Sequence, residues 1–247
     1  LSHFNPFPAN AKYIGPISRF KNYYNNINII DTPYILMGIA SGPEPQRTIF
    51  EELITKQFLK DGSKAIILRG LPANNEDIYY NENITYVNHL PTDLMAYHIL
   101  NSNIVICRAG YSTIMDLTLL KKNKNVILVP TPGQTEQEYL AGRLKSSAYF
   151  YSMSQDRLSL KHGKEALATY KCADFPDGHD LFEQAIKEFI KKIRSLNVPA
   201  KIISAFENSG RTLFLDPFFK KQIWDFDPVP VGYGEKSDNV EVLARVL

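Results

Sequence analysis

Short, almost continuously apolar runs alternate along this chain with segments in which apolar residues recur every three or four positions. Apolar runs of this length are typical of strands buried on both faces, as in parallel sheets. The spacing of three and four is typical of amphipathic helices. The apolar runs that predict strands are 34–39, 64–68, 84–87, 103–107 and 125–129.

Four stripes with helical spacing follow the first, third, fourth and fifth of these runs. They cover residues 50–58, 94–99, 114–120 and 139–144. Strands that alternate with helices at this rhythm indicate crossover units. The predicted fold is therefore α/β, a Rossmann-like open parallel sheet with helices on both faces, followed by a C-terminal appendage.

The rhythm divides the chain into three predicted parts. Residues 1–30, rich in Asn, Pro, Tyr and Phe, are predicted to be a connecting segment, and residues 31–172 form the α/β domain. Residues 173–247 contain a strongly amphipathic helix at 181–196 and then an irregular aromatic and proline-rich stretch, with one further strand predicted at 201–205.

Composition and charge exclude several classes of protein. The 247 residues carry 28 Lys+Arg against 26 Asp+Glu, a net charge of +2 that gives no reason to expect nucleic-acid binding. No apolar run approaches the ~20 residues of a transmembrane helix. Cys107 and Cys172 are the only cysteines, which excludes a disulfide scaffold and fits a cytoplasmic protein. No metal-ligand spacing occurs, so we expect neither a metal nor a cofactor.

A first candidate loop, from Ser41 to Arg47, follows the first apolar run. Small residues before a helix expose backbone N–H groups and the positive end of the helix dipole, which attract phosphate. Ser41 and Gly42 fit this role, and Arg47 can add charge and paired hydrogen bonds. A tight turn with proline in the first helical turn explains the same residues without a ligand.

A second candidate loop spans residues 107–116. Gly110 follows a strand directly, and Ser112 and Thr113 open a helix, where their hydroxyls and amides can hold a diphosphate oxygen. Asp116, one turn along, can accept hydrogen bonds from a ribose diol. A capping box from Thr113 to Asp116 is an equally good explanation.

A third candidate loop spans residues 130–139. Gln134, Gln137 and Glu138 offer the mixture of donors and acceptors that sugar hydroxyls require. The alternative is a solvated first helical turn, with Thr135 and Glu138 as its capping box.

Together the three loops resemble the C-terminal, donor-binding half of a GT-B glycosyltransferase. The resemblance is to glycosyltransferase family 28, of the peptidoglycan-precursor N-acetylglucosaminyltransferase type, and the first loop is similar to that of related predicted bacterial glycosyltransferases. It covers roughly residues 11–156, and its most specific part runs from Arg108 to Asp116. The other matching segments are 13–19, 90–96, 126–130 and 134–141.

The resemblance implies a glycosyltransferase of hexosyltransferase type. Its substrates would be a nucleotide-diphosphate sugar, with UDP as the expected nucleotide, and an unknown glycan, lipid or small-molecule acceptor. The backbone of Leu90 would contact the uracil, Arg19 would lie near the phosphates, and Asp116 would hold the ribose. The predicted substrate-binding residues are thus Arg19, Ser41, Gly42, Arg47, Leu90, Arg108, Gly110, Ser112, Thr113, Asp116, Gln134, Gln137 and Glu138.

Two positions depart from the family pattern. Asp116 stands where the family usually has Glu, and Glu138 replaces the second of two glutamines. Since Asp is shorter by one methylene, a water-bridged ribose contact is one expectation.

Nothing in the sequence resembles the N-terminal half that usually supplies the acceptor site and the general base. Because the chain also begins at Leu1 rather than Met, we expect either a piece of a longer protein or a partner subunit that supplies this half. His89, beside the predicted base loop, is the one catalytic candidate. A non-catalytic nucleotide-binding or assembly module and a nucleotide-sugar epimerase stay open as alternatives, as does a peripheral location at the inner face of the membrane.

Overall fold

The computed structural model describes residues 14–20, 34–71, 78–175 and 181–195. The chain divides into two compact units, of which one is Pro16–His179 and the other joins Leu1–Gly15 with Asp180–Leu247. In the second unit the structure describes helix α6 (Leu181–Ser195), which confirms the predicted amphipathic helix. The strand predicted at 201–205 and the irregular stretch after it lie outside the described residues.

A seven-stranded sheet forms the centre of the first unit, with the order β3-β4-β2-β1-β5-β6-β7. The five predicted strands are confirmed within one or two residues. They are buried at every position, which explains why they read as continuous apolar runs. Their bounds are β1 (Leu36–Ile39), β2 (Ala65–Leu68), β4 (Ile84–Val87), β5 (Ile104–Arg108) and β6 (Val126–Val129).

Two short strands that the sequence did not predict complete the sheet. β3 (Ile78–Asn81) pairs antiparallel with β4 through a tight turn in which Glu82 has a φ of 51°. β7 (Tyr151–Ser152) extends the other edge in parallel to β6. The sheet is therefore parallel except at β3.

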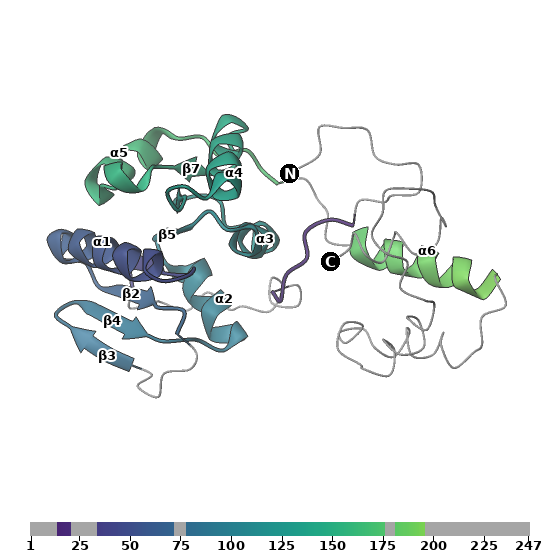
Figure 1. Ribbon diagram of the computed structural model, residues 1–247, viewed down its shortest axis with the longest axis horizontal. Coiled ribbons are helices and arrows are strands. Elements are labelled where there is room, and N and C mark those ends of the chain that lie inside the picture. The colour runs from purple at the N-terminus through teal and green to yellow at the C-terminus, as the bar shows by residue number, and fades with distance from the viewer. Residues whose placement is uncertain (1–13, 21–33, 72–77, 176–180, 196–247) are drawn as a thin grey trace. The chain divides into compact units, whose positions relative to one another are not determined.

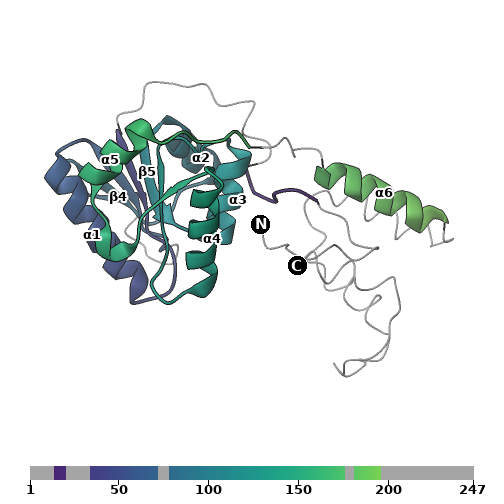
Figure 2. The same cartoon turned by 90° about the horizontal axis from the view of Figure 1, so that it is seen from above.

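Helices cover both faces of the sheet, as the sequence predicted. Figures 1 and 2 show α1 and α5 on one face and α2, α3 and α4 on the other. Within the described residues, no helix combines the length and apolar character of a membrane span. The helices are α1 (Gln46–Asp61), α2 (Thr92–Asn101), α3 (Tyr111–Leu119), α4 (Thr135–Ser146) and α5 (Leu160–Thr169), with a 3₁₀ turn, η1 (Gln155–Arg157), before α5.

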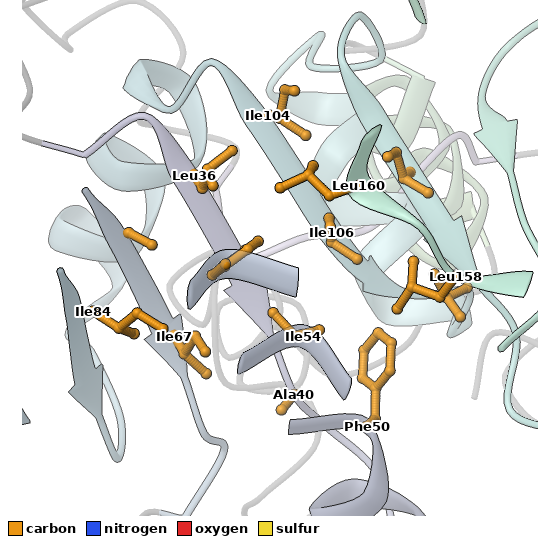
Figure 3. Close-up of a cluster of buried hydrophobic side chains, with 14 of the residues drawn as sticks. Leu36, Ala40, Phe50, Ile54, Ile67, Ile84, Ile104, Ile106, Leu158 and Leu160 are labelled. Carbon is orange, nitrogen blue, oxygen red and sulfur yellow. The ribbon is translucent and has the colours of Figure 1, made fainter. Parts of the chain in front are cut away.

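The main hydrophobic cluster lies between the sheet and α1 (Figure 3). Phe50, Ile54 and Phe58 recur on one face of α1 and are fully buried against the strands. Leu158 and Leu160 close the cluster at its edge. Each fully buried side chain of this size contributes about 1.5–3 kcal/mol to folding, so this cluster fixes α1, and with it the loop before α1, on the sheet.

Gly38, in the middle of β1, permits this close packing. A Cβ atom at Gly38 would lie 2.9 Å from Cγ2 of Ile54 and 3.3 Å from Cγ1 of Ile67. Both neighbours are β-branched and fully enclosed, so they have little freedom to move away.

We expect Gly38→Ala to lower the free energy of unfolding by about 1–3 kcal/mol through overpacking. The matched control is Gly142→Ala in α4, where a new Cβ would meet no atom within 4 Å. That change should raise stability by up to about 1 kcal/mol, since alanine is the better helix former. Urea denaturation of both variants measures this, and equal effects of the two would contradict the proposed contact between α1 and β1.

Candidate functional site

The carboxyl ends of three neighbouring strands meet at one edge of the sheet. The chain runs from β1 outward to β2 and β4 and then returns to β5, on the other side of β1. Ligands of open α/β sheets bind at such a switch point, beyond the carboxyl ends of the strands. The loops at 40–45, 109–110 and 130–134 follow β1, β5 and β6, and they therefore occupy adjacent positions at this edge.

The first loop turns through Gly42 and leads into a helix that is already capped. Gly42 has a φ of +117°, a conformation that favours glycine, although a Cβ there would meet no atom. In the first turn of α1, the Thr48 N–H donates to Oε2 of Glu44 (3.2 Å) and the Arg47 N–H to the Pro43 carbonyl (3.1 Å). The carboxylate of Glu44 thus already occupies the anion position of this helix.

Arg47, predicted as a phosphate ligand, is enclosed by carboxylates. It is 5% exposed and donates to Glu44 (2.5 Å) and to Glu51, which also accepts from Arg69 at 3.0 Å. The hydrogen bond from Arg47 holds the pKa of Glu44 below its usual value. To reach a phosphate, Arg47 would have to leave both carboxylates. Ser41, at the start of the same loop, is partly exposed and can contact a ligand without such a change.

The second loop ends in a helix whose amino end is open. Gly110 is the N-cap of α3 and contributes no side-chain cap. Within the part of the chain that the structure describes, the N–H groups of Ser112 and Thr113 donate to no protein group, and Ser112 is exposed. Adjacent unsatisfied N–H groups at the positive end of a helix dipole form a binding place for an anion.

Asp116 in α3 does not belong to a capping box. α3 begins at Tyr111, so Thr113 is its third helical residue rather than its N-cap. The carboxylate of Asp116 instead accepts a hydrogen bond from the Ser18 hydroxyl (2.5 Å) and lies 3.8 Å from Nε of Arg19. The capping-box interpretation of the second loop is therefore wrong, and the carboxylate faces Ser18 and Arg19 instead.

Arg19 links helices α2 and α3. Its Nη2 donates to the sulfur of Met95 in α2 (2.6 Å), while its Nε faces Asp116 in α3. The fully buried ring of Phe20, 4.9 Å from the guanidinium, anchors the segment. The structure thus brings together Arg19 and Asp116, two of the residues predicted to bind the sugar donor. It adds Ser18, which only its place beside Arg19 in the sequence could have suggested.

The environment of Asp116 suits a carboxylate that accepts hydrogen bonds from a ligand. Burial raises the pKa of Asp116, while the hydrogen bond from Ser18 and the charge of Arg19 act in the opposite direction. The side chain of Asp116 is 14% exposed and that of Arg19 48%. With little water to compete, hydrogen bonds to Asp116 are stronger than those to a solvated carboxylate.

Gln137 organises the third loop. Its Oε1 accepts from the Thr131 N–H (3.0 Å), and its Nε2 donates to Oε1 of Gln134 (2.5 Å). The amide of Gln137 is therefore largely used within the loop, while Gln134 keeps its own amide N–H₂ for a ligand.

Glu138 supports the same loop from one turn into α4. Its Oε1 accepts from the Gly133 N–H (2.9 Å). The capping box expected between Thr135 and Glu138 is not formed, because Gln134 is the N-cap and Thr135 is already helical. The expectation failed because the sequence pattern alone does not show which residue begins the helix.

A cavity of about 390 Å³ opens beside Glu138, between α4 and the segment from β7 to η1. Its lining mixes an aromatic ring, two cations, a carboxylate and two hydroxyls. The residues that supply these groups are Glu138, Lys145, Tyr151, Ser152, Ser154 and Arg157. The predicted sugar-binding end of the site is therefore bordered by polar groups.

The predicted base loop lies before α2. Leu90 is partly buried there and His89 is exposed, with no hydrogen bond among the described residues to orient it.

His98 lies near the other end of α2 against the rings of Tyr34 and Tyr97, and burial lowers its pKa. In the described ranges, no group of three or more His, Cys, Asp or Glu residues is placed to hold a metal ion.

One family of known proteins matches more than half of the chain. The family described as the glycosyltransferase family 28 C-terminal domain matches residues 54–195. No curated protein sequence matches the chain.

Solved structures of similar architecture include three transferases. The glycotransferase of kitacinnamycin is 12% identical with a TM-score of 0.46, and covers 80% of this chain and 48% of its own. MurG of Acinetobacter baumannii is 17% identical with a TM-score of 0.40, covering 67% and 49%. Spinosyn forosaminyltransferase SpnP is 11% identical with a TM-score of 0.40, covering 80% and 48%. The chain spans about half the length of each.

The raised pKa of Asp116 gives its replacement a pH signature. In the folded protein Asp116 takes up a proton at higher pH than in the unfolded chain, so its ionised form costs stability at pH 7. Asp116→Asn should therefore raise the free energy of unfolding at pH 7, by up to about 1 kcal/mol. The gain should shrink as the pH falls through the raised pKa.

Asp61 provides the control, because its pKa is shifted in the opposite direction to that of Asp116. Burial alone would raise the pKa of Asp61, but hydrogen bonds from Lys164 and Ser63 outweigh it and hold the pKa below its ordinary value. Asp61→Asn should lower stability at pH 7, with a loss that vanishes as the pH falls through the depressed pKa. Urea denaturation at pH 7 and pH 4 distinguishes the two, and changes of the same sign would refute the assignment for Asp116.

Proposed function

The chain belongs to the family of glycosyltransferase family 28 C-terminal domains, and on that premise we propose that it binds the sugar donor of a glycosyltransferase. The donor is a nucleotide-diphosphate sugar, with UDP as the nucleotide. The observation that carries the proposal is the open amino end of α3 at the strand-order switch, since a diphosphate needs an anion site there.

The diphosphate binds at the N–H groups and hydroxyls of Ser112 and Thr113. Those N–H groups are unsatisfied within the described residues, unlike the first turn of α1, where Glu44 already serves as the anion. A second source of positive charge is Arg19, whose side chain is 48% exposed and whose guanidinium can turn toward the phosphates. Both features favour a diphosphate over a neutral ligand.

The nucleoside and the sugar extend from this point in two directions. The ribose diol donates to Asp116, and the base lies toward Leu90 at the start of α2, which Arg19 connects to α3. The sugar lies toward the third loop, where Gln134 has an amide N–H₂ and Glu138 a second carboxylate oxygen for its hydroxyls.

In the proposed reaction the bond between the sugar anomeric carbon and the diphosphate oxygen breaks, and an acceptor oxygen bonds to that carbon. Negative charge develops on the leaving diphosphate, where the N–H groups and dipole of α3 stabilise it without reorganisation. The acceptor proton passes to a base supplied by an acceptor-binding half or partner subunit.

Incubation with radiolabelled UDP-sugars and candidate acceptors tests the reaction class. Label transferred to a glycan, lipid or small molecule supports the proposal. Interconversion of the free nucleotide sugars would instead indicate an epimerase, and binding without turnover in the presence of the acceptor-binding half would indicate an assembly module.

The anion site makes opposite predictions for binding and stability. Ser112→Asp places a carboxylate where the diphosphate is proposed to bind, and should weaken UDP binding at least about tenfold by charge repulsion. The same carboxylate should leave stability unchanged or raise it by about 0.3–1 kcal/mol, since it interacts favourably with the helix dipole. Titration calorimetry and urea denaturation measure the two effects.

Ser159→Asp is the matched control. Ser159 is the N-cap of α5, which packs near Gln57 and Asp61 in the carboxyl-terminal half of α1. Aspartate caps a helix about as well as serine, so this variant should bind UDP like the wild type. If Ser112→Asp also binds UDP normally, the diphosphate does not lie at α3.

The ribose contact is tested with Asp116→Ala. We expect this change to weaken UDP binding by ~1–3 kcal/mol, through loss of charge-assisted hydrogen bonds. For UDP that lacks the ribose 2′-hydroxyl, the difference between wild type and variant should be much smaller. Ser18→Ala, which keeps the carboxylate, is the control, and equal losses for the two nucleotides would rule out the ribose role.

A further inference from the structure

Arg108, the last residue of β5, is almost completely enclosed. It is 1% exposed and is the largest of the fully buried side chains in the described ranges. Its guanidinium lies 3.9 Å above the ring of Phe50. Nη2 donates to the carbonyl of Gln46 (3.0 Å) and Nη1 to the carbonyl of Pro130 (3.3 Å). A side chain this deeply buried has no free surface with which to touch a ligand.

The charge of Arg108 is not neutralised by any carboxylate in the described part of the chain. Arg47, by contrast, forms ion pairs with two carboxylates. Nε of Arg108 is buried and has no hydrogen-bond partner among the residues that the structure describes. Burial lowers the pKa of Arg108 to about 10, so the side chain is still a cation at neutral pH. An unpaired buried cation costs free energy, and an apolar side chain of similar volume would avoid that cost.

The two carbonyls that Arg108 holds belong to the loops on either side of its own. Gln46 is the first residue of α1, directly after the first loop, and Pro130 is the first residue after β6, where the third loop begins. Arg108 itself leads into the second loop. Since β1 and β6 are the two neighbours of β5 in the sheet, one guanidinium connects all three loops of the candidate site.

We propose that Arg108 is a positioning residue for the diphosphate and the sugar: it fixes the three loops relative to one another and touches no part of the donor. This inference rests on the proposed function. It replaces direct substrate binding, which the sequence suggested for Arg108, with action through the backbone of Gln46 and Pro130. The nucleoside, which binds toward Asp116 and Leu90, depends much less on this connection.

Lys122 offers a matched control at the other end of β5. It too is a cation that donates to two backbone carbonyls, those of Leu100 (3.2 Å) and Ser102 (2.8 Å), although Lys122 is only partly buried. Burial lowers its pKa to about 8. Ser102 precedes the amino end of β5, so Lys122→Met removes a partly buried charge that also holds two carbonyls, at the end of β5 opposite to the three loops.

The experiment compares UDP and uridine binding to Arg108→Met, Arg108→Lys and Lys122→Met by titration, with urea denaturation to report folding. Arg108→Met should weaken UDP at least about tenfold while uridine changes by less than about twofold, since loop position matters for the diphosphate. Arg108→Lys, which keeps the charge but loses the two-pronged geometry, should fall between. Lys122→Met should alter stability alone.

Three outcomes would overturn the inference. They are wild-type UDP affinity in folded Arg108→Met, equal losses of UDP and uridine, and a selective loss of UDP in Lys122→Met. If Arg108→Met does not fold, the same ratio of UDP to uridine binding is taken from Arg108→Lys. Failure of the proposed function itself is distinguishable, because the wild-type chain would then bind neither UDP nor another nucleoside diphosphate.

Discussion

Burial of β5 on both faces and along both edges is the constraint on which the rest of the structure depends. Its five residues are all buried, and it pairs in parallel with β1 on one side and β6 on the other. The chain can reach that central position only by returning across β1, which creates the switch in strand order. The amino ends of α1 and α3 consequently emerge at neighbouring strands, and a ligand site at this edge is a product of the topology rather than of any single motif.

The two helix ends at this edge differ in a way that composition does not reveal. At α1 the carboxylate of Glu44 satisfies the first-turn N–H of Thr48, and Arg47 balances its charge. At α3 the N-cap is Gly110, which has no side chain to compete with a ligand. Because a charge at a helix end is worth only about 0.3–1 kcal/mol, an anion is recognised here by several such contacts together. A net charge of +2 over the whole chain is irrelevant to this local arrangement.

The fold was more predictable than the contacts of the site, for physical reasons. Doubly buried strands must be apolar throughout, so β1, β2, β4, β5 and β6 were visible in the sequence, whereas β7 has two residues and β3 is an antiparallel edge strand. Neither capping box, the one expected at Thr135 or the one left open at Thr113, is formed, because a Thr three residues before an acid fits the first turn as well as the N-cap. The pairing of Arg47 with Glu51 was open to prediction, since an acid four residues after an arginine faces it on a helix, whereas Glu44 precedes α1 and reaches Arg47 from the loop.

The contacts of Asp116 show how the unliganded site can be both ordered and ready to exchange partners. Its ion pair with Arg19 spans 3.8 Å, with an arginine that is 48% exposed. Pairs of this kind contribute about 0–1 kcal/mol. Hydrogen bonds from a ribose diol to a partly desolvated carboxylate are worth about 1.5–3 kcal/mol, so under the proposed function the ribose displaces Arg19 from Asp116. The freed guanidinium then lies beside α3, where a diphosphate adds negative charge, so binding of the ribose and neutralisation of the phosphates reinforce each other.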